Sequence, residues 1–303
     1  VRWHSFPSKD FYKHVFWRSF SIFLAGILIH AYPFIQQDWD WSSFRIMGVL
    51  QRIALSYGIA ATIVIHFKVR KVLIISTGIL IFYWVLLWIG GGNNPYSLEN
   101  NVIRHFDIFL LGEKHLYKGT GIPFDPEGLI STITSVVTVL IGYLVGAMMH
   151  TTKNFSDNIK RMSIFGLSMI TIGLIWGLIF PINKQLWTSS YVLFTGGIAT
   201  LVLVILSWVI DVKNLKNYFW IFKVFGTNSI FLFILSGLWT KTILKIKFNF
   251  DGNLLSGYSY LYKTVFIPIA GEMNGSLLFA FCHVIAFWFI LYWLYRKKIF
   301  INL

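Results

Sequence analysis

The sequence has few charged residues and only one cysteine. Asp, Glu, Lys and Arg make up 13% of its 303 residues, and 56% are hydrophobic. A soluble domain carries about twice that charged fraction, so the composition excludes an ordinary soluble protein and indicates one surrounded by the lipid bilayer. The single cysteine, Cys282, excludes an intrachain disulfide, and its apolar neighbours predict an inert, buried thiol.

Acidic residues are the scarcer of the two charge types. The twelve Asp and Glu residues fall in predicted loops or at the ends of predicted spans, and none lies in the middle of one. Basic residues outnumber them to give a net charge of +14, but they gather at span ends rather than on one face. This distribution is typical of membrane topology, so we expect no nucleic-acid partner.

Apolar segments long enough to cross a bilayer as helices recur along the chain. There are eight: residues 15–35, 46–66, 71–90, 128–149, 160–181, 187–210, 220–240 and 276–295. They predict an all-α protein, a polytopic transmembrane helical bundle of about eight spans that forms a single domain over residues 1–303. The two long connections, residues 91–127 and 241–275, are predicted extracytoplasmic loops. The aromatic stretch 258–268 is expected to form an interfacial or re-entrant helix.

Loop charges predict the orientation, because the side richer in Lys and Arg is cytoplasmic. Nine of these residues fall on one side and sixteen on the other. The sixteen are Arg2, Lys9, Lys13, Arg18, Lys68, Arg70, Lys71, Lys153, Lys160, Arg161, Lys213, Lys216, Lys223, Arg296, Lys297 and Lys298. Both termini are therefore expected in the cytoplasm. The low charge and the Lys-, Ile- and Asn-rich loops favour a bacterial inner membrane.

Arg52 and the adjacent Gln51 interrupt the predicted span 46–66 roughly two turns from its start. A charge at that depth costs several kcal/mol unless it faces a partner or a water-filled cavity, so we interpret the pair as site residues. The alternative is an arginine that extends outward to water or pairs with a structural carboxylate. Because no span carries an acid, a phosphate-bearing ligand or an acid from the outer mouth would have to be the partner.

The segment 124–129 opens the fourth predicted span from the outside and allows two readings. Asp125 as N-cap, Pro126 at the first helical position and Glu127 near the positive end of the dipole would make a helix start. Alternatively, Asp125 and Glu127 form an anionic pair that orients an amine substrate or acts as a base. Residues alone do not separate these readings.

Three further polar residues lie at predicted span ends. Asn183 and Lys184 belong to a tight outer hairpin, residues 181–187, which by itself is typical of a polar turn with interfacial anchors. Asn228 either satisfies backbone groups near a helix start or lines a cytoplasmic ligand entrance.

The histidines do not predict a metal site, since no two have a metal-ligand spacing with a carboxylate partner. His105 and His115 lie with Asp107 in the predicted loop 91–127, where one could act as a base; a solvated loop histidine is the alternative. The chain has no Gly-rich phosphate loop, no serine elbow and no zinc signature.

Four stretches occur in an order typical of one family. They are Arg45–Arg52; Asp107–Gly112 with residues 115–117 and 125–129; residues 181–187 with 190–192; and Tyr295–Phe300. Together they resemble the heparan-alpha-glucosaminide N-acetyltransferase family and its bacterial relatives, from about Phe16 to the C-terminus. The resemblance implies transfer of an acetyl group from cytosolic acetyl-CoA, a co-substrate, to the amino group of a glucosamine-type sugar or glycan outside. A homo-oligomer is possible, and no metal is implied.

The resemblance also gives the polar residues possible roles. Residues that could bind acetyl-CoA or line its path are Arg45, Gln51, Arg52, Asn183, Lys184 and Asn228. Asp125 and Glu127 could orient the amino sugar. With His115, these two carboxylates are also the candidates for catalysis.

The chain departs from the family's pattern in two places. Family members carry two further spans upstream, with the histidine regarded as catalytic between them, and nothing in this chain matches that motif. Ile108 stands where an arginine commonly follows the aspartate. We therefore expect this chain to lack the catalytic histidine. The main alternative function is a permease for a sugar or amino sugar, although inverted repeats and broken spans are not evident in the sequence.

Overall fold

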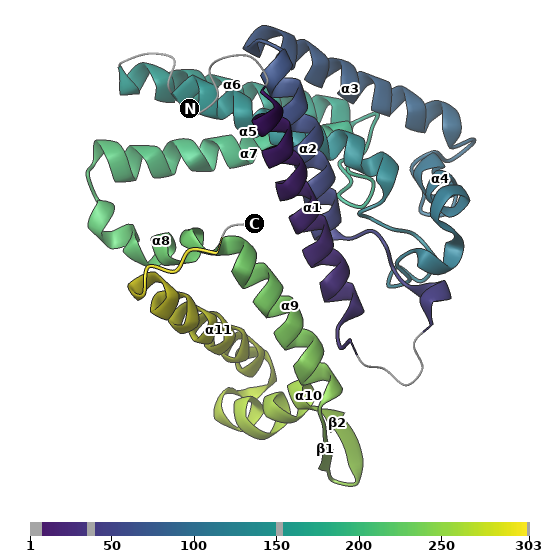
Figure 1. Cartoon of the computed structure of the whole chain (residues 1–303), viewed down its shortest axis with the longest axis vertical. Helices are drawn as coiled ribbons and strands as arrows, with labels where there is room; N and C mark the ends of the chain where they lie inside the picture. The colour runs from purple at the N-terminus through teal and green to yellow at the C-terminus, as the bar shows by residue number, and fades with distance from the viewer. Residues whose placement is uncertain (1–7, 35–39, 150–153, 302–303) are drawn as a thin grey trace. The chain divides into compact units, whose positions relative to one another are not determined.

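The computed structural model describes residues 8–34, 40–149 and 154–301, which are almost entirely helical (Figure 1). The helices are α1 (Lys9–Ala31), α2 (Val49–His66), α3 (Val69–Gly90), α4 (Val102–Leu111), α5 (Leu129–Met149), α6 (Phe155–Gly177), α7 (Ser189–Ser207), α8 (Trp220–Thr227), α9 (Ser229–Lys245), α10 (Gly257–Leu261) and α11 (Ile267–Arg296). One antiparallel hairpin joins β1 (Lys247–Phe250) to β2 (Asn253–Ser256). Arg2 and Lys153, used in the charge count, lie outside the described residues.

The prediction of an all-α polytopic membrane protein is confirmed. Among the described residues, seven helices are long and apolar enough to cross a membrane, and a bent pair raises the number to eight. That pair, Lys216–Thr227 and Ser229–Lys245, bends by 65° within the predicted span 220–240. The bend occurs at Asn228, whose φ of −136° and ψ of 42° are not helical.

Both predicted loops contain helical structure. Residues 91–127 include α4 and the short turn Glu113–His115. In the second, helical structure runs from Gly257 to Arg296, interrupted at Gly271, where φ is +75°. Glu272 follows this break, so one carboxylate does lie within the last apolar helix, where sequence analysis expected none.

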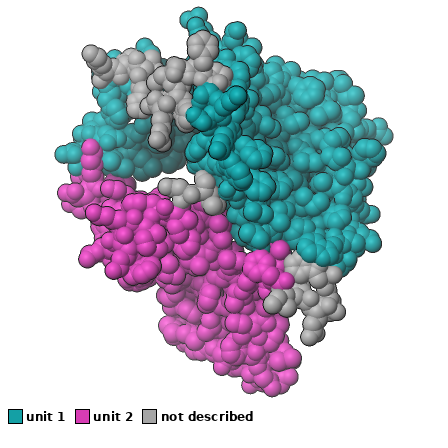
Figure 2. All heavy atoms as spheres, in the orientation of Figure 1, with its two compact units in different colours: residues 1–30, 40–214 teal, residues 31–39, 215–303 magenta. Residues whose placement is uncertain are grey.

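The contacts group the chain into two compact units, where sequence analysis expected one domain (Figure 2). The first comprises residues 1–30 and 40–214, and the second comprises residues 31–39 and 215–303. In the second unit, Val224, Leu291 and Leu294 form a small core. Cys282 is exposed on α11, so the prediction of a buried thiol is wrong. The apolar neighbours of Cys282 did not indicate burial, because many apolar residues of α11 are themselves exposed.

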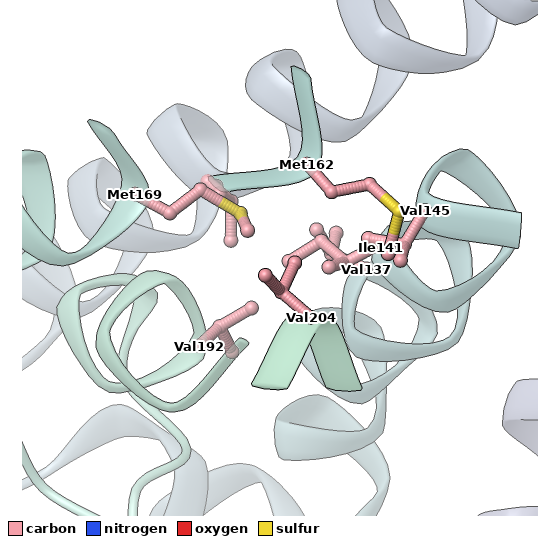
Figure 3. Packing of buried hydrophobic residues seen from close by; sticks show 8 residues of the cluster. Val137, Ile141, Val145, Met162, Met169, Val192 and Val204 are labelled. Atoms are coloured by element: carbon pink, nitrogen blue, oxygen red, sulfur yellow. The ribbon is translucent and has the colours of Figure 1, made fainter. Parts of the chain in front are cut away.

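The core of the first unit is built around α5. Methionines of α6, Met162 and Met169, pack with aliphatic side chains of α5 and α7 (Figure 3). These aliphatic residues are Val137, Ile141, Val145, Val192 and Val204. Helix α5 also packs against α2 and α3, so it lies at the centre of the first unit.

Glycines bring α6 and α7 into close contact. A Cβ atom built on Gly197 would lie 2.6 Å from the carbonyl oxygen of Gly166 and 2.9 Å from the backbone nitrogen of Ile170. Small residues at such positions let helix backbones approach closely, which is a main source of helix association in lipid.

We predict that Gly197→Ala destabilises the first unit, because the new methyl group meets backbone atoms that cannot rotate away. Overpacking typically costs about 1–3 kcal/mol. The measurement is thermal unfolding of the detergent-purified protein, with Gly78→Ala as control. Nothing lies within 4 Å of a Cβ at Gly78, so this variant should be neutral or slightly stabilising. Equal unfolding temperatures for both variants would contradict the close packing of α6 and α7.

Candidate functional site

The site is organised around the turn Asp125–Gly128, which precedes α5. The helix begins at Leu129, so Pro126 and Glu127 form a turn and not the first helical residues. Asp125 does cap, but within the turn: its Oδ1 accepts the N–H of Glu127 at 3.0 Å. The turn therefore precedes the helix, and the carboxylates and the Pro126 carbonyl accept hydrogen bonds from arginines of neighbouring elements.

Arg45 binds both carboxylates of this turn. Its Nε and Nη2 donate to the two oxygens of Asp125 at 2.9 and 2.8 Å, and Nη2 also donates to Glu127 Oε2 at 2.7 Å. Asp125 is fully buried, whereas the side chains of Arg45 and Glu127 are 25% and 22% exposed. Burial opposes the charged guanidinium, but Asp125 and Glu127 outweigh it and raise the pKa of Arg45 above its ordinary value. This bidentate ion pair holds the turn closed.

Tyr117 covers the same guanidinium, with its ring centroid 4.6 Å from Cζ of Arg45. His115 bonds through Nδ1 to the carbonyl oxygen of Phe44, the residue before Arg45, at 2.6 Å. A neutral ring that donates from Nδ1 keeps Nε2 as an acceptor. The predicted loop 91–127 thus supplies both a cover for Arg45 and a candidate base.

Arg52 meets the turn from α2. Because residues 46–48 are extended, Arg52 falls in the first turn of the helix, nearer the end of the span than the sequence predicts. It is only 5% exposed. Its Nη2 donates to the carbonyl of Pro126 and to the hydroxyl of Ser131, and Cζ lies 4.5 Å from the ring centroid of Trp187.

Within the described chain, Arg52 neither extends outward to water nor pairs with a carboxylate, the two alternatives to a site residue that the sequence left open. Across residues 8–34, 40–149 and 154–301, every ion pair of an arginine with a carboxylate belongs to Arg45, and Nε of Arg52 has no hydrogen-bond partner there. A buried cation surrounded by a carbonyl, a hydroxyl and an aromatic face is only partly compensated. Such a group favours an anionic or strongly dipolar ligand.

Gln51 supports the fold beside the site. Its Nε2 donates to the carbonyl of Ile46 at 3.0 Å, and its amide packs so closely on Gly26 of α1 that a side chain there would collide with it. Gln51 is 1% exposed. The amide thus fixes the start of α2, and with it the position of Arg52.

The outer hairpin reaches the site through Trp187. Asn183 accepts the N–H groups of Gln185 and Leu186 at 2.8 and 3.3 Å, so its side chain closes the hairpin. Lys184 is exposed at the tip. Trp187 donates from Nε1 to Thr138 at 3.2 Å and turns its ring toward Arg52. Sequence analysis assigned Trp187 only to the membrane interface and missed this role, since interfacial tryptophans carry no signal of what they face.

Asn228 belongs to the second unit and is 1% exposed. Its Nδ2 donates to the carbonyl of Ile299 at 3.1 Å, and its Oδ1 accepts the N–H of Ile301 at 2.7 Å. Both ends of the amide are therefore bonded to the C-terminal segment. The structure brings together Arg45, Arg52, Asp125 and Glu127 around one turn of the first unit, while His115 bonds to the carbonyl of Phe44, the residue before Arg45.

Asp107 of α4 is a second residue that the site analysis of the sequence left out. It is fully buried, and its Oδ1 accepts the N–H of Leu129, the first residue of α5, at 3.1 Å. Burial raises the pKa of its carboxyl to about 7. Its membership of the motif stretch 107–112 was the available signal, but nothing in the sequence says that α4 folds back onto the start of α5.

A cavity of about 360 Å³ begins at Trp187 and lies between α5 and α7. Its wall is mostly aliphatic, with hydroxyls contributed by Thr138, Tyr191, Thr195 and Thr200. Among the described residues, no group of three or more His, Cys, Asp or Glu side chains is arranged to hold a metal ion.

Comparison with known proteins supports the resemblance seen in the motifs. No family model matches the chain. It is 27% identical over 274 residues to heparan-alpha-glucosaminide N-acetyltransferase of Homo sapiens, covering 72% of this chain and 41% of that protein. The Mus musculus protein of the same name is 28% identical over 279 residues, covering 73% of this chain and 41% of that protein. The chain spans less than half the length of these curated relatives. The chain is thus similar to two curated heparan-alpha-glucosaminide N-acetyltransferases over about seven tenths of its own length.

Proposed function

We propose that this chain carries the donor site of a transmembrane acetyltransferase, which moves an acetyl group from cytosolic acetyl-CoA to the amino group of a glucosamine-type sugar or glycan outside. The observation that carries the proposal is Arg52, a buried guanidinium with no carboxylate of the described chain bound to it. The kinship with two N-acetyltransferases supplies the reaction class. The expected setting is a bacterial inner membrane, with both termini cytoplasmic and homo-oligomers possible.

Attack of an amine on a thioester carbonyl creates a negatively charged oxygen, which needs hydrogen-bond donors in a site without water. Nε of Arg52 has no partner among the described residues and is buried, so it suits this role. Trp187 covers the guanidinium and keeps water away. We assign Arg52 to the acetyl carbonyl or a neighbouring dipole of the donor.

The acceptor amine must lose a proton before it attacks. Asp125 uses both oxygens on Arg45, so we assign it to holding the turn. Glu127 is bonded to Arg45 through one oxygen and is partly exposed, so it is the better candidate for orienting the ammonium group. His115, whose Nδ1 is engaged, is the candidate base within the described chain.

The cavity between α5 and α7 suits the arm of the donor. Its wall is mostly aliphatic with a few hydroxyls, and Trp187, whose ring covers Arg52, is one of its lining residues. Lys184 is exposed on the outer hairpin, so with the acetyl group at Arg52 it lies at the wrong end of the path for the donor's phosphates, and we assign it no role. Gln51, Asn183 and Asn228 use their amides on backbone groups, so we assign them to supporting the fold around the path.

A permease for a sugar or amino sugar is the second candidate, and one observation favours it. The bent pair Lys216–Thr227 and Ser229–Lys245 forms a broken span or a re-entrant loop, and broken spans are typical of transporter binding sites. Counterflow of labelled glucosamine into liposomes that contain the protein but no acyl-CoA separates the two functions. We expect none above the level of empty liposomes; saturable counterflow would favour the permease.

We predict that Arg52→Ala weakens acetyl-CoA binding by about tenfold or more, equivalent to about 1.4 kcal/mol. Arg45→Ala should change the affinity less, because the guanidinium of Arg45 is already occupied by Asp125 and Glu127. It should instead lower stability by about 3–5 kcal/mol, since the buried Asp125 loses its partner. Isothermal titration of the detergent-purified protein gives the affinity, and thermal unfolding gives the stability.

Arg18→Ala is the matched control, because Arg18 is exposed on α1 and, among the described residues, stacks on Tyr57 away from the turn. It should leave the affinity unchanged. If Arg52→Ala binds acetyl-CoA as tightly as the Arg18 variant, or if both site arginines have equal effects, Arg52 is not part of the donor site.

A further inference from the structure

Asp107 is buried against the site, and the proposed function leaves its chemistry unused. It lies on α4, outside the helices that could span the membrane. Its Oδ1 binds the N–H of Leu129, but Oδ2 has no hydrogen-bond partner within the described parts of the chain. An unpartnered oxygen on a fully buried carboxyl is costly to keep and calls for an explanation.

The carboxyl touches the backbone of the turn directly. A Cβ atom built on Gly128 would collide with Oδ2 of Asp107, so only glycine fits at that position. Two successive residues, Gly128 and Leu129, are therefore set by one side chain from another helix. Because Pro126 and Glu127 precede them immediately, the position of Asp107 decides where the oxygens offered to Arg52 and Arg45 lie.

Several charged or titratable groups surround Asp107. Arg52 approaches from α2, Asp125 from the turn, and the Tyr83 hydroxyl, which donates to the carbonyl of Leu186, from α3. On α4 itself, Arg104 bonds to the carbonyls of Pro123 and Glu99 and His105 is exposed. Burial and the charge of Asp125 raise the pKa of Asp107, while the Leu129 N–H and Arg52 oppose the rise. With a pKa of about 7, Asp107 changes charge near neutral pH.

An asparagine could accept the Leu129 N–H equally well without the cost of a buried charge. The carboxyl therefore does something beyond capping α5. We propose that Asp107 is a positioning residue of the donor site, which holds the Asp125–Leu129 turn against Arg52 and sets the electrostatic field there by its charge. This rests on the proposed function of the turn.

The sign of the pH effect follows from the charges. Ionised Asp107 adds a negative charge near Arg52 and weakens binding of an anionic donor, whereas protonated Asp107 does not. Acetyl-CoA affinity of the wild-type protein should therefore fall as the pH rises from 6 to 8. We expect the affinity to change by about tenfold. This is the change that follows if bound acetyl-CoA raises the pKa of the Asp107 carboxyl by about one unit. Asp107→Asn, which keeps an acceptor but cannot ionise, should lose this dependence.

The first arm of the test needs no ligand. Hydrogen exchange of the full chain should be faster at residues 126–131 in Asp107→Ala, because Leu129 loses its acceptor, and Asp107→Asn should restore the slow exchange. Asp40→Asn is the control, since Asp40 caps the exposed turn Trp41–Ser43 and not the start of α5. Unchanged exchange in Asp107→Ala would overturn the positioning role.

The second arm is titration of acetyl-CoA at pH 6, 7 and 8 into the wild-type protein, Asp107→Asn and Asp40→Asn. A wild-type pH profile that persists in Asp107→Asn would overturn the electrostatic role. If the wild-type protein bound no acetyl-CoA at any pH, the proposed function would fail, while the exchange arm would still decide whether Asp107 holds the turn.

The stability of the same variants gives a further check. In the folded protein the pKa of the Asp107 carboxyl is raised above 3.8. The contribution of Asp107 to the protein's free energy of unfolding therefore falls as the pH rises from about 4 to 7 and then stays level. Asp107→Asn should therefore unfold at a higher temperature than the wild-type protein at pH 8, with the difference closing toward pH 5. A less stable Asp107→Asn at pH 8 would mean that the carboxylate is a structural cap, against the proposal.

Discussion

Desolvation of the Arg52 guanidinium is the cost that the residues around it must offset. Removing a charged side chain from water is expensive, and the described chain supplies a carbonyl, a hydroxyl and an aromatic ring in place of a carboxylate. The carbonyl belongs to the turn that Arg45 holds, and the hydroxyl belongs to α5. The ring of Trp187 is positioned by the outer hairpin. The incomplete compensation at Nε is what makes this position suitable for a ligand.

The contacts that surround Arg52 also surround the helix α5. Ser131 and Ser135, on one face of this helix, meet Arg52 and Ser56 of α2, and Thr138 receives the indole of Trp187. Close contact of α6 with α7 through glycines holds the far side of the same bundle. Since the turn before α5 carries the carboxylates, rigid placement of the helix becomes rigid placement of the site. Asp107 then adds a carboxyl whose charge changes near neutral pH at the point where helix and turn meet.

The fold was predictable where hydrophobicity alone decides it, as in the apolar runs that became α2, α3, α5, α6 and α7. It was less so where a helix continues through polar or kinked positions. A helix over residues 258–268 was expected, but with Pro268 and Glu272 in the sequence its continuation into the last span was not, and neither was the bend at Asn228. Arg52 stood out because its neighbours in sequence are apolar. The Arg45–Asp125 pair and the contacts of Trp187 and Asp107 join residues distant in sequence, so only the tertiary fold reveals them.

Hydrogen–deuterium exchange of the intact chain with and without acetyl-CoA tests the central claim most directly. The account predicts slower exchange around the turn, residues 125–131, and at the end of α2 that carries Arg52, with little change in residues 215–303. Glucosamine alone should not reproduce the slowing at Arg52. Protection confined to residues 215–303, or none at saturating acetyl-CoA, would contradict a donor site at Arg52.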